Sequence, residues 1–347
     1  MGQPSSGSNK GERTRSLKQR IKSSLGPWGY IAPAGVLMLV ISFFPQAFQI
    51  WMAFTDYRLK NLRFNVFNPE TWDKFGPPLV GFQNFIKVLT NDLAIENYDF
   101  MRMLKFNITW TVSNVVFHVA LGILIALALN NKELIGRRFY RAIFVLPWAM
   151  PGLIIAFTWR NMFDRRFGAI NQSIAALNEF FGLSFSTDIR WLDNPAPIFD
   201  GAFDFIPFAF YAVLITNIWL GWPFMTVIAT GALQSIPGEL YESARMDGAS
   251  GWQQLWNITL PLIRPAMVPA MMVGTIWTFN NFNVIYFITQ GGPFGRTELL
   301  VTQAFKLVFT SRLYGVAAAF GLVIFVILLF FTLLQNRVTR ATEAYYE

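Results

Sequence analysis

Six long apolar runs constrain this chain more than any other feature. A helix needs about 20 predominantly apolar residues to cross the hydrocarbon core of a bilayer, and each run is close to that length or longer. Within a bilayer a single segment must satisfy its own backbone N–H and C=O groups, so it spans as an α-helix. We therefore predict an all-α polytopic membrane protein with six transmembrane helices, over residues 30–54, 106–130, 142–159, 205–233, 262–289 and 314–336.

The composition supports a membrane protein and excludes several kinds of chemistry. The 347 residues are 54% hydrophobic and only 14% charged, whereas soluble domains average about 25% charged. The chain has no cysteine, which excludes disulfides, thiolate nucleophiles and cysteine-ligated metals. It has one histidine, so a multi-histidine metal site is excluded too. We assign the net charge of +8 to basic tails and loops, and we do not expect nucleic-acid binding.

Basic segments indicate which way the chain crosses the membrane. Residues 1–29 are rich in Lys and Arg, and the apolar run that follows is longer than the 7–15 residues or so of a signal peptide, so we expect it to be retained as a span. Because basic segments stay in the cytoplasm, the 1–29 tail and the 131–141 loop should lie inside. Six spans then place the 337–347 tail in the cytoplasm and residues 55–105 outside, around one six-span domain (30–336).

Residues 236–261 are polar although they lie between two apolar runs. Pro237 suits a first helical position, where its missing N–H is not needed. Glu239 and Glu242 would follow in the first turns, which the positive end of the helix dipole favours for acidic residues. Gly248 suits a left-handed helix stop. These signals predict a short helix that ends near residue 247.

A second helix should follow at once. Ser250 and Gln253 have the spacing of a capping box, and we expect this second helix to end before Pro261. The segment would then be a helix–turn–helix at the cytoplasmic membrane face.

The sequence lacks the residues that would let the chain supply its own energy. No G-x-x-x-x-G-K-[ST] phosphate loop occurs, so we predict a non-catalytic subunit without a cofactor. No carboxylate lies in the middle of a span, and His118 is the one intramembrane histidine, so a proton relay is not indicated. Without a neighbouring carboxylate in the sequence, we expect His118 to be a neutral, hydrogen-bonded packing residue. Energy must then come from a partner, or the chain is a passive pore.

The 236–261 segment resembles the EAA loop of binding-protein-dependent ABC importer permeases. The family pattern is E-A-A, three residues, G, nine residues and I-x-L-P, and the one departure is Ser243 in place of the middle Ala. In that family the helix pair docks on the cytoplasmic ATPase. The resemblance implies an ATPase-coupling role for Glu242, Ser243, Ala244, Asp247, Gly248, Ala249, Ile258, Leu260 and Pro261.

Neutral polar residues within the spans indicate the kind of solute that is carried. Asn217, Thr278 and Asn281 lie in mid-span, where an amide or hydroxyl is costly unless it is paired or faces water. Sugar hydroxyls suit such partners, and sugar C–H faces stack on aromatic rings. We favour a sugar-facing role for these residues over helix–helix hydrogen bonding.

Nearly the whole chain resembles carbohydrate-uptake permeases, and residues 163–347 resemble the MalF-type subunit of maltose/maltodextrin ABC importers. The matching segments include 141–147, 167–171, 279–282 and 289–293, in addition to the EAA loop. In that family one sugar is held by residues of the fourth and fifth spans. The matching positions, which the resemblance implies are substrate-binding, are Asn217, Leu220, Gly221, Phe224, Gly274, Trp277, Thr278 and Asn281.

Four of these positions depart from the maltose pattern. Phe224 stands where the family protein has Tyr, Gly274 where it has Ser, Trp277 where it has Phe, and Thr278 where it has Asn. These differences leave open whether the sugar is maltose, trehalose, sucrose or a longer glucan.

The resemblance implies a type I ABC importer permease fold and a complete set of partners. The chain would form half of the translocation path of an ATP-driven importer for a disaccharide or oligosaccharide, in the cytoplasmic (inner) membrane of a bacterium or archaeon. Its expected partners are a second, MalG-like permease subunit, a MalK-like ATPase homodimer that binds ATP, an extracytoplasmic sugar-binding protein, the sugar and the lipid bilayer. The alternatives are a permease for another polar solute, such as glycerol phosphate, and a passive channel.

Overall fold

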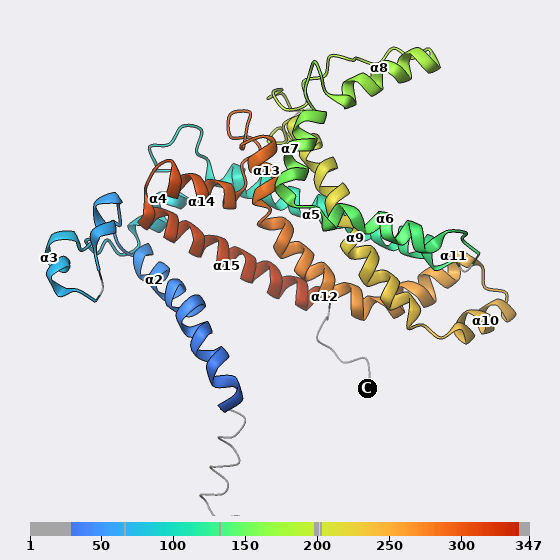
Figure 1. Cartoon of the computed structure of the whole chain (residues 1–347), viewed down its shortest axis with the longest axis horizontal. Helices are drawn as coiled ribbons and strands as arrows, with labels where there is room; N and C mark the ends of the chain where they lie inside the picture. The colour runs from blue at the N-terminus through green and yellow to red at the C-terminus, as the bar shows by residue number, and fades with distance from the viewer. Residues whose placement is uncertain (1–28, 66, 132, 198–200, 202, 340–347) are drawn as a thin grey trace, which may run out of the picture. The chain divides into compact units, whose positions relative to one another are not determined.

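A computed structural model describes residues 29–65, 67–131, 133–197, 201 and 203–339, which are mainly helical (Figure 1). These residues form no β-strand, only isolated bridges between Thr55 and Leu79 and between Pro197 and Pro207. The expected tails at 1–28 and 340–347 lie outside the described residues. The chain divides into two units, Met1–Met52 and Ala53–Glu347.

The first unit contains most of one helix, which runs over Gly29–Ala53. None of the residues in its most apolar 18-residue stretch is buried. It includes a π-helical turn at Leu39–Phe43 and continues as α2 (Phe44–Ala53). Its 25 residues are long enough to cross a membrane, as predicted for the first span.

The second unit contains the remaining helices. Short 3-10 turns occupy Leu59–Arg63 and Pro69–Thr71. The α-helices before the 236–261 segment are α3 (Trp72–Phe75), α4 (Gln83–Leu89), α5 (Phe100–Asn130), α6 (Arg137–Ala149), α7 (Gly152–Met162), α8 (Ala169–Phe181) and α9 (Ala209–Gln234). Those that follow are α10 (Gly238–Met246), α11 (Gly251–Gln254), α12 (Leu260–Phe279), α13 (Phe282–Ile288), α14 (Leu300–Phe309) and α15 (Tyr314–Thr339), with a π-helical turn at Leu255–Thr259.

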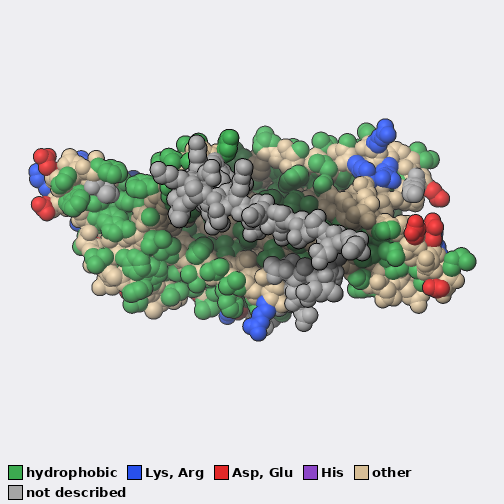
Figure 2. Space-filling model, turned by 90° about the horizontal axis from the view of Figure 1, so that it is seen from below, with side chains coloured by type: hydrophobic (Ala, Val, Ile, Leu, Met, Phe, Trp, Pro, Cys, Tyr) green, Lys and Arg blue, Asp and Glu red, His purple; other side chains and the backbone are tan. Residues whose placement is uncertain are grey.

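The number of membrane-spanning segments agrees with the predicted six when one bent pair is counted as a span. Five helical segments of the described chain are long and apolar enough: Gly29–Ala53, Phe100–Asn130, Ala209–Gln234, Gly251–Ile288 and Tyr314–Arg337. The sixth is α6 with α7, which meet at an angle of 92°. In Figure 2, hydrophobic side chains cover much of the visible face, and most of the visible charged side chains lie toward its two ends.

The predicted third span is broken rather than merely kinked. Pro147 lies inside α6, and the break comes at Met150 and Pro151. A residue that precedes proline is pushed out of the helical region, and Met150 has an extended backbone with ψ of 143°. The two prolines therefore differ in effect, because only the second coincides with a change of chain direction.

The fifth span begins earlier than predicted and is also interrupted. The second helix of the 236–261 segment does not end before Pro261: α11, the π-helical turn and α12 form one continuous helix. Pro261 comes two residues after the π-helical turn, which ends with the bond from Leu260 N to Leu255 O, and the helix continues through this proline. The interruption comes at Asn280 and Asn281, and the Asn281 side chain caps α13 by accepting from Val284 N at 3.3 Å.

Two helices lie between the predicted spans, in segments for which no helix was predicted. α8 extends away from the helices around α9 (Figure 1) and buries Asn171, which donates to the carbonyls of Arg165 and Ile189. α14 packs on α15 and buries Leu300 and Leu307. The apolar spacing of α14 was present in the sequence, but the run is too short to be recognised as a span.

A polar face of α5 stabilises the interruption between α12 and α13. Asn107, Thr111, Asn114 and His118 recur every three or four residues, so they share one face of the helix. Asn107 Nδ2 donates to Phe279 O at 3.1 Å, and Trp110 Nε1 donates to Thr278 O at 3.0 Å. These bonds add partners for carbonyls at the end of α12, where the regular helical bonds stop, and Thr278 O also accepts from Asn281 N at 3.2 Å.

Asn107 also holds the beginning of α14. Its Oδ1 accepts from Leu300 N at 2.9 Å, and its side chain is fully buried. One amide thus joins three helices that lie far apart in the sequence.

We predict that Asn107→Leu lowers the stability of the second unit by about 2 to 4 kcal/mol, because it leaves Phe279 O and Leu300 N buried without these partners. The measurement is thermal unfolding of the purified chain in detergent. Asn257→Leu, at an exposed position, is the control and should change the unfolding temperature little. Equal effects of the two substitutions would contradict the role of Asn107.

Candidate functional site

A cavity of about 230 Å³ lies among α6, α7, α9, α12 and the α12–α13 interruption. All eight residues predicted to bind substrate line it: Asn217, Leu220, Gly221, Phe224, Gly274, Trp277, Thr278 and Asn281. Residues that the sequence analysis did not select line it too, namely His118, Trp148, Met150, Gly152 and Met225. The structure therefore brings the predicted set together, whereas contact with a substrate stays a prediction.

Both broken spans contribute to this cavity at their breaks. Met150 and Gly152 flank the bend between α6 and α7, and Asn281 lies in the interruption between α12 and α13. α7 also packs against α13, with Gly152 next to Asn283. Non-helical backbone at membrane depth is tolerated where it is buried in protein or lines a cavity, and these breaks meet that condition.

Three asparagines form a chain of hydrogen bonds at the cavity. Asn281 Nδ2 donates to Asn217 Oδ1 at 2.6 Å, and Asn217 Nδ2 donates to Asn114 Oδ1 at 2.8 Å. Asn114 Nδ2 donates in turn to Trp110 O at 2.8 Å. These bonds tie α5, α9 and the start of α13 together.

Asn217 makes hydrogen bonds between helices, which was the alternative to a sugar-facing role for this residue. Its side chain is only 2% exposed, and its oxygen and nitrogen both bond to other asparagines. Asn281 is more accessible and stands at the end of the chain of bonds. Asn281 is therefore better placed than Asn217 to offer an amide to a ligand.

Aromatic rings line another part of the cavity. The Phe224 ring lies 5.9 Å from that of Trp148 and 5.2 Å from that of Trp277, between centroids. Trp277 is 55% exposed and Trp148 48% exposed. Trp148 belongs to the third span, whereas all eight predicted substrate-binding positions lie in the fourth and fifth spans.

Two of the predicted site glycines have a packing role. A Cβ atom on Gly221 would collide with the His118 ring, and one on Gly274 would come within 2.7 Å of Met225 Cε. Gly221 thus lets α9 approach α5 closely, as small residues do between membrane helices. Neither glycine offers a polar side chain to a ligand.

His118 makes the contact expected of a packing histidine. It is buried on α5, and its Nε2 lies 2.8 Å from Asn217 O. This carbonyl belongs to α9, so the contact joins α5 to α9.

The helix–turn–helix predicted over 236–261 is present as α10 and α11 (Figure 1). Pro237 is the N-terminal flanking residue of α10 rather than its first helical residue, because its ψ of 131° is extended. Gly248 has the predicted left-handed conformation, with φ of +80°. The Ser250–Gln253 capping box is formed in both directions.

The turn is held by bonds to the end of α10. Gly248 N donates to Arg245 O at 3.0 Å, and Ala249 N donates to Ala244 O at 2.8 Å. The Tyr241 and Thr259 hydroxyls, 2.9 Å apart, link α10 to the π-helical turn. Of the positions matching the EAA loop, Glu242, Ser243, Asp247, Gly248 and Pro261 are exposed, and Ala244, Ala249, Ile258 and Leu260 are half-buried.

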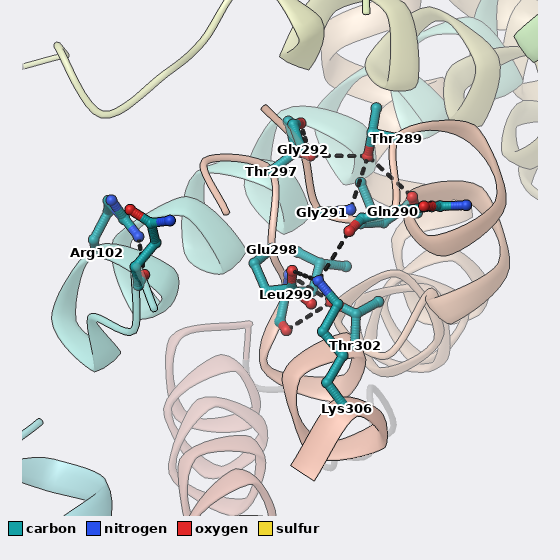
Figure 3. A network of polar contacts seen from close by, with 12 residues as sticks. Arg102, Thr289, Gln290, Gly291, Gly292, Thr297, Glu298, Leu299, Thr302 and Lys306 are labelled. Carbon is teal, nitrogen blue, oxygen red and sulfur yellow. Dashed lines mark hydrogen bonds and ion pairs between the residues drawn. The ribbon is translucent and has the colours of Figure 1, made fainter. Parts of the chain in front are cut away.

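A second polar network lies between α13 and α14 and was missed by the sequence analysis (Figure 3). The Lys306 ammonium bonds to Glu298 Oε2 at 2.5 Å and to Gln290 O at 2.9 Å. Burial raises the pKa of the Glu298 carboxyl above its usual value, and the Lys306 charge opposes that change. The network fixes the connection after α13, but it does not border the cavity.

Comparison with known proteins agrees with this arrangement. The cavity, the interrupted spans and the helix–turn–helix define a membrane permease. Residues 118–343 match the family model described as "Binding-protein-dependent transport system inner membrane component". The chain belongs to this family, and it is therefore a membrane-embedded, non-catalytic permease subunit of an ABC importer.

Curated relatives cover most of the chain. The galactooligosaccharides transport system permease protein GanP of Bacillus subtilis is 34% identical over 93% of this chain and 72% of its own length. The trehalose/maltose transport system permease protein MalF of Thermococcus litoralis is 31% identical over 93% of this chain and 97% of its own length.

A solved structure has the same fold. A chain of a bacterial ABC transporter involved in the import of the acidic polysaccharide alginate matches with a TM-score of 0.71 at 22% identity, over 94% of this chain and 99% of that one.

We predict that Gly221→Ala lowers stability by about 1 to 3 kcal/mol, because the new Cβ must displace the His118 ring in a packed interface. Gly231→Ala on the same helix is the matched control, since nothing lies within 4 Å of its added Cβ. Thermal unfolding of both variants in detergent checks this. A Gly221→Ala protein as stable as Gly231→Ala would show that α5 and α9 are not tightly packed at this point.

Proposed function

We propose that this chain forms half of the translocation path for a neutral disaccharide or oligosaccharide in an ATP-driven importer. The observation that supports this most is the lining of the cavity. Its described residues include amides, a hydroxyl and large aromatic rings, and none of them is Asp, Glu, Lys or Arg. Amides and hydroxyls pair with sugar hydroxyls, and the rings of Trp148, Phe224 and Trp277 offer faces for sugar C–H groups.

A phosphorylated solute fits this cavity less well. A phosphate group is bound best by Arg or Lys through charge-assisted hydrogen bonds, and the described lining has neither. The names of the relatives point in the same direction, since they include galactooligosaccharides, maltodextrin, trehalose and maltose permeases. Which saccharide this chain carries depends on Trp277 and Thr278, two positions that depart from the maltose pattern.

The remaining parts of the proposal concern the assembly. The six-span domain would cover residues 30–336, with both tails and the 236–261 segment in the cytoplasm and residues 55–105 outside. A second permease subunit would complete the path, and an extracytoplasmic sugar-binding protein would deliver the sugar. An ATPase homodimer would bind ATP and contact α10, α11 and the turn between them. Glu242 and Ser243 of α10 and Asp247 and Gly248 of the turn are exposed.

Asn281→Ala should raise the half-saturating sugar concentration for uptake about tenfold, which corresponds to losing one or two hydrogen bonds to the sugar. The measurement is uptake of labelled maltose and trehalose into proteoliposomes that hold the complete transporter. Asn280→Ala is the control, because Asn280 bonds to Ile276 O on its own helix and does not line the cavity. Unchanged kinetics in Asn281→Ala would remove this residue from the sugar site.

Gly248→Pro should abolish uptake while the protein still inserts in the membrane. Proline cannot adopt the φ of +80° and removes the N–H that bonds to Arg245 O, so α10 and α11 lose their relative orientation. Uptake and sugar-stimulated ATP hydrolysis in the reconstituted complex provide the measurement. Gly238→Ala, in the same segment but without a positive φ, should retain both, and normal uptake by Gly248→Pro would argue against coupling through this turn.

A further inference from the structure

A second chamber lies along α6 and α9, on the side of the cavity that leads to the 236–261 segment. Its volume is about 300 Å³, which is within the usual range for small-molecule sites. The cavity is lined by α9 residues 217–225, and the chamber by α9 residues from Pro223 to Gln234. On α6, Trp148 lines the cavity, whereas Val145, Phe144 and Arg141 line the chamber. The two spaces therefore follow one another along the same pair of helices.

The chamber contains hydrogen-bonding groups that its surroundings leave unused. Arg141 Nε and Nη2 are buried and have no hydrogen-bond partner among the described residues. Thr230 and Gln234 line the chamber from α9 and add a hydroxyl and an amide. Arg141 as a whole is half-buried, and these two nitrogens are its groups that are shielded from water without a partner. Such burial is costly, and a ligand with several oxygens would relieve that cost.

The rest of the lining is largely apolar, which suits the C–H faces of a sugar. Phe144 offers an aromatic face, and Leu129 and Pro223 are apolar. Among the described residues, the lining thus consists of the Arg141 cation, neutral polar groups and hydrophobic surface, without an acidic side chain. A saccharide presents hydroxyl oxygens to the guanidinium and C–H faces to the ring.

We propose that this chamber is a second saccharide site, in which Arg141 donates hydrogen bonds to hydroxyl oxygens of a sugar that has left the cavity. The proposal rests on the proposed function, because it requires that a sugar passes between α6 and α9. It assigns to Arg141 a binding role that differs from those of the cavity residues, since this side chain does not line the cavity.

The absence of cysteine in the natural chain allows a direct test. Thr230→Cys places one thiol in the chamber, and Gly231→Cys provides a second, more exposed reporter at its edge. The complete transporter, with cysteine-free partner subunits, is reconstituted in phosphatidylcholine liposomes, and the rate of thiol alkylation is measured with increasing maltose or trehalose. Phe67→Cys, at a residue that is 83% exposed and lies neither in the chamber nor in the 236–261 segment, controls for effects of sugar on the reagent.

We expect the sugar that is transported to slow alkylation of the chamber cysteine but not of Phe67→Cys. Adding Arg141→Leu should raise the sugar concentration needed for half protection about tenfold, because hydrogen bonds from a charged donor are lost. Arg138→Leu removes an equal charge from an exposed position of the same helix and should leave protection unchanged.

The possible failures can be told apart. If the unsubstituted complex takes up no sugar, the proposed function is wrong, and the second site is wrong with it. If it takes up sugar but neither chamber cysteine is protected, only the second site is overturned. Protection that persists unchanged in Arg141→Leu contradicts the role of Arg141, and protection by anionic phosphatidylglycerol in place of sugar would show that the chamber binds lipid.

Discussion

The hydrogen bonds from α5 to the end of α12 are the interaction on which the rest of the site depends. Asn107 and Trp110 satisfy the carbonyls of Phe279 and Thr278, so the chain can leave its helix at Asn280 and Asn281 within a membrane span. Without such partners, an interruption at this depth would expose unpaired backbone groups. The interruption in turn places Asn281 at the cavity and lets it bond to Asn217.

The same relation between a break and the cavity recurs in the third span. Met150 and Pro151 separate α6 from α7, and residues on both sides of the break line the cavity. α7 and α13, the two short helices that follow the breaks, pack against each other. The two helix breaks bring polar backbone close to the cavity, and its described lining has no charged Asp, Glu, Lys or Arg side chain. This combination suits a neutral, hydroxyl-rich solute.

Much of this could be predicted from the sequence because hydrophobic length and helix-capping patterns are local properties. The apolar runs gave the spans, and Ser250, Gln253 and Gly248 gave the turn between α10 and α11. The positions from Asn217 to Asn281 came from a family resemblance, and they meet at one cavity. What the sequence could not supply was pairing across space: Asn217 bonds to Asn114 more than a hundred residues earlier, and Trp148 completes an aromatic surface from another span. The expected helix end before Pro261 was wrong because the helix continues through this proline, directly after a π-helical turn that the sequence pattern did not indicate.

The continuity of the helix from α11 through α12 has a mechanical consequence. From Gly251 to Phe279 no loop interrupts the helix, and at 1.5 Å per residue this segment is about 40 Å long. One of its ends adjoins the exposed turn at Gly248, and the other carries Trp277 and Thr278 at the cavity. The exposed turn and the cavity wall are therefore joined by helix without an intervening loop, and the π-helical turn with Pro261, Pro265 and Pro269 marks the part of this connection at which a helix bends most readily.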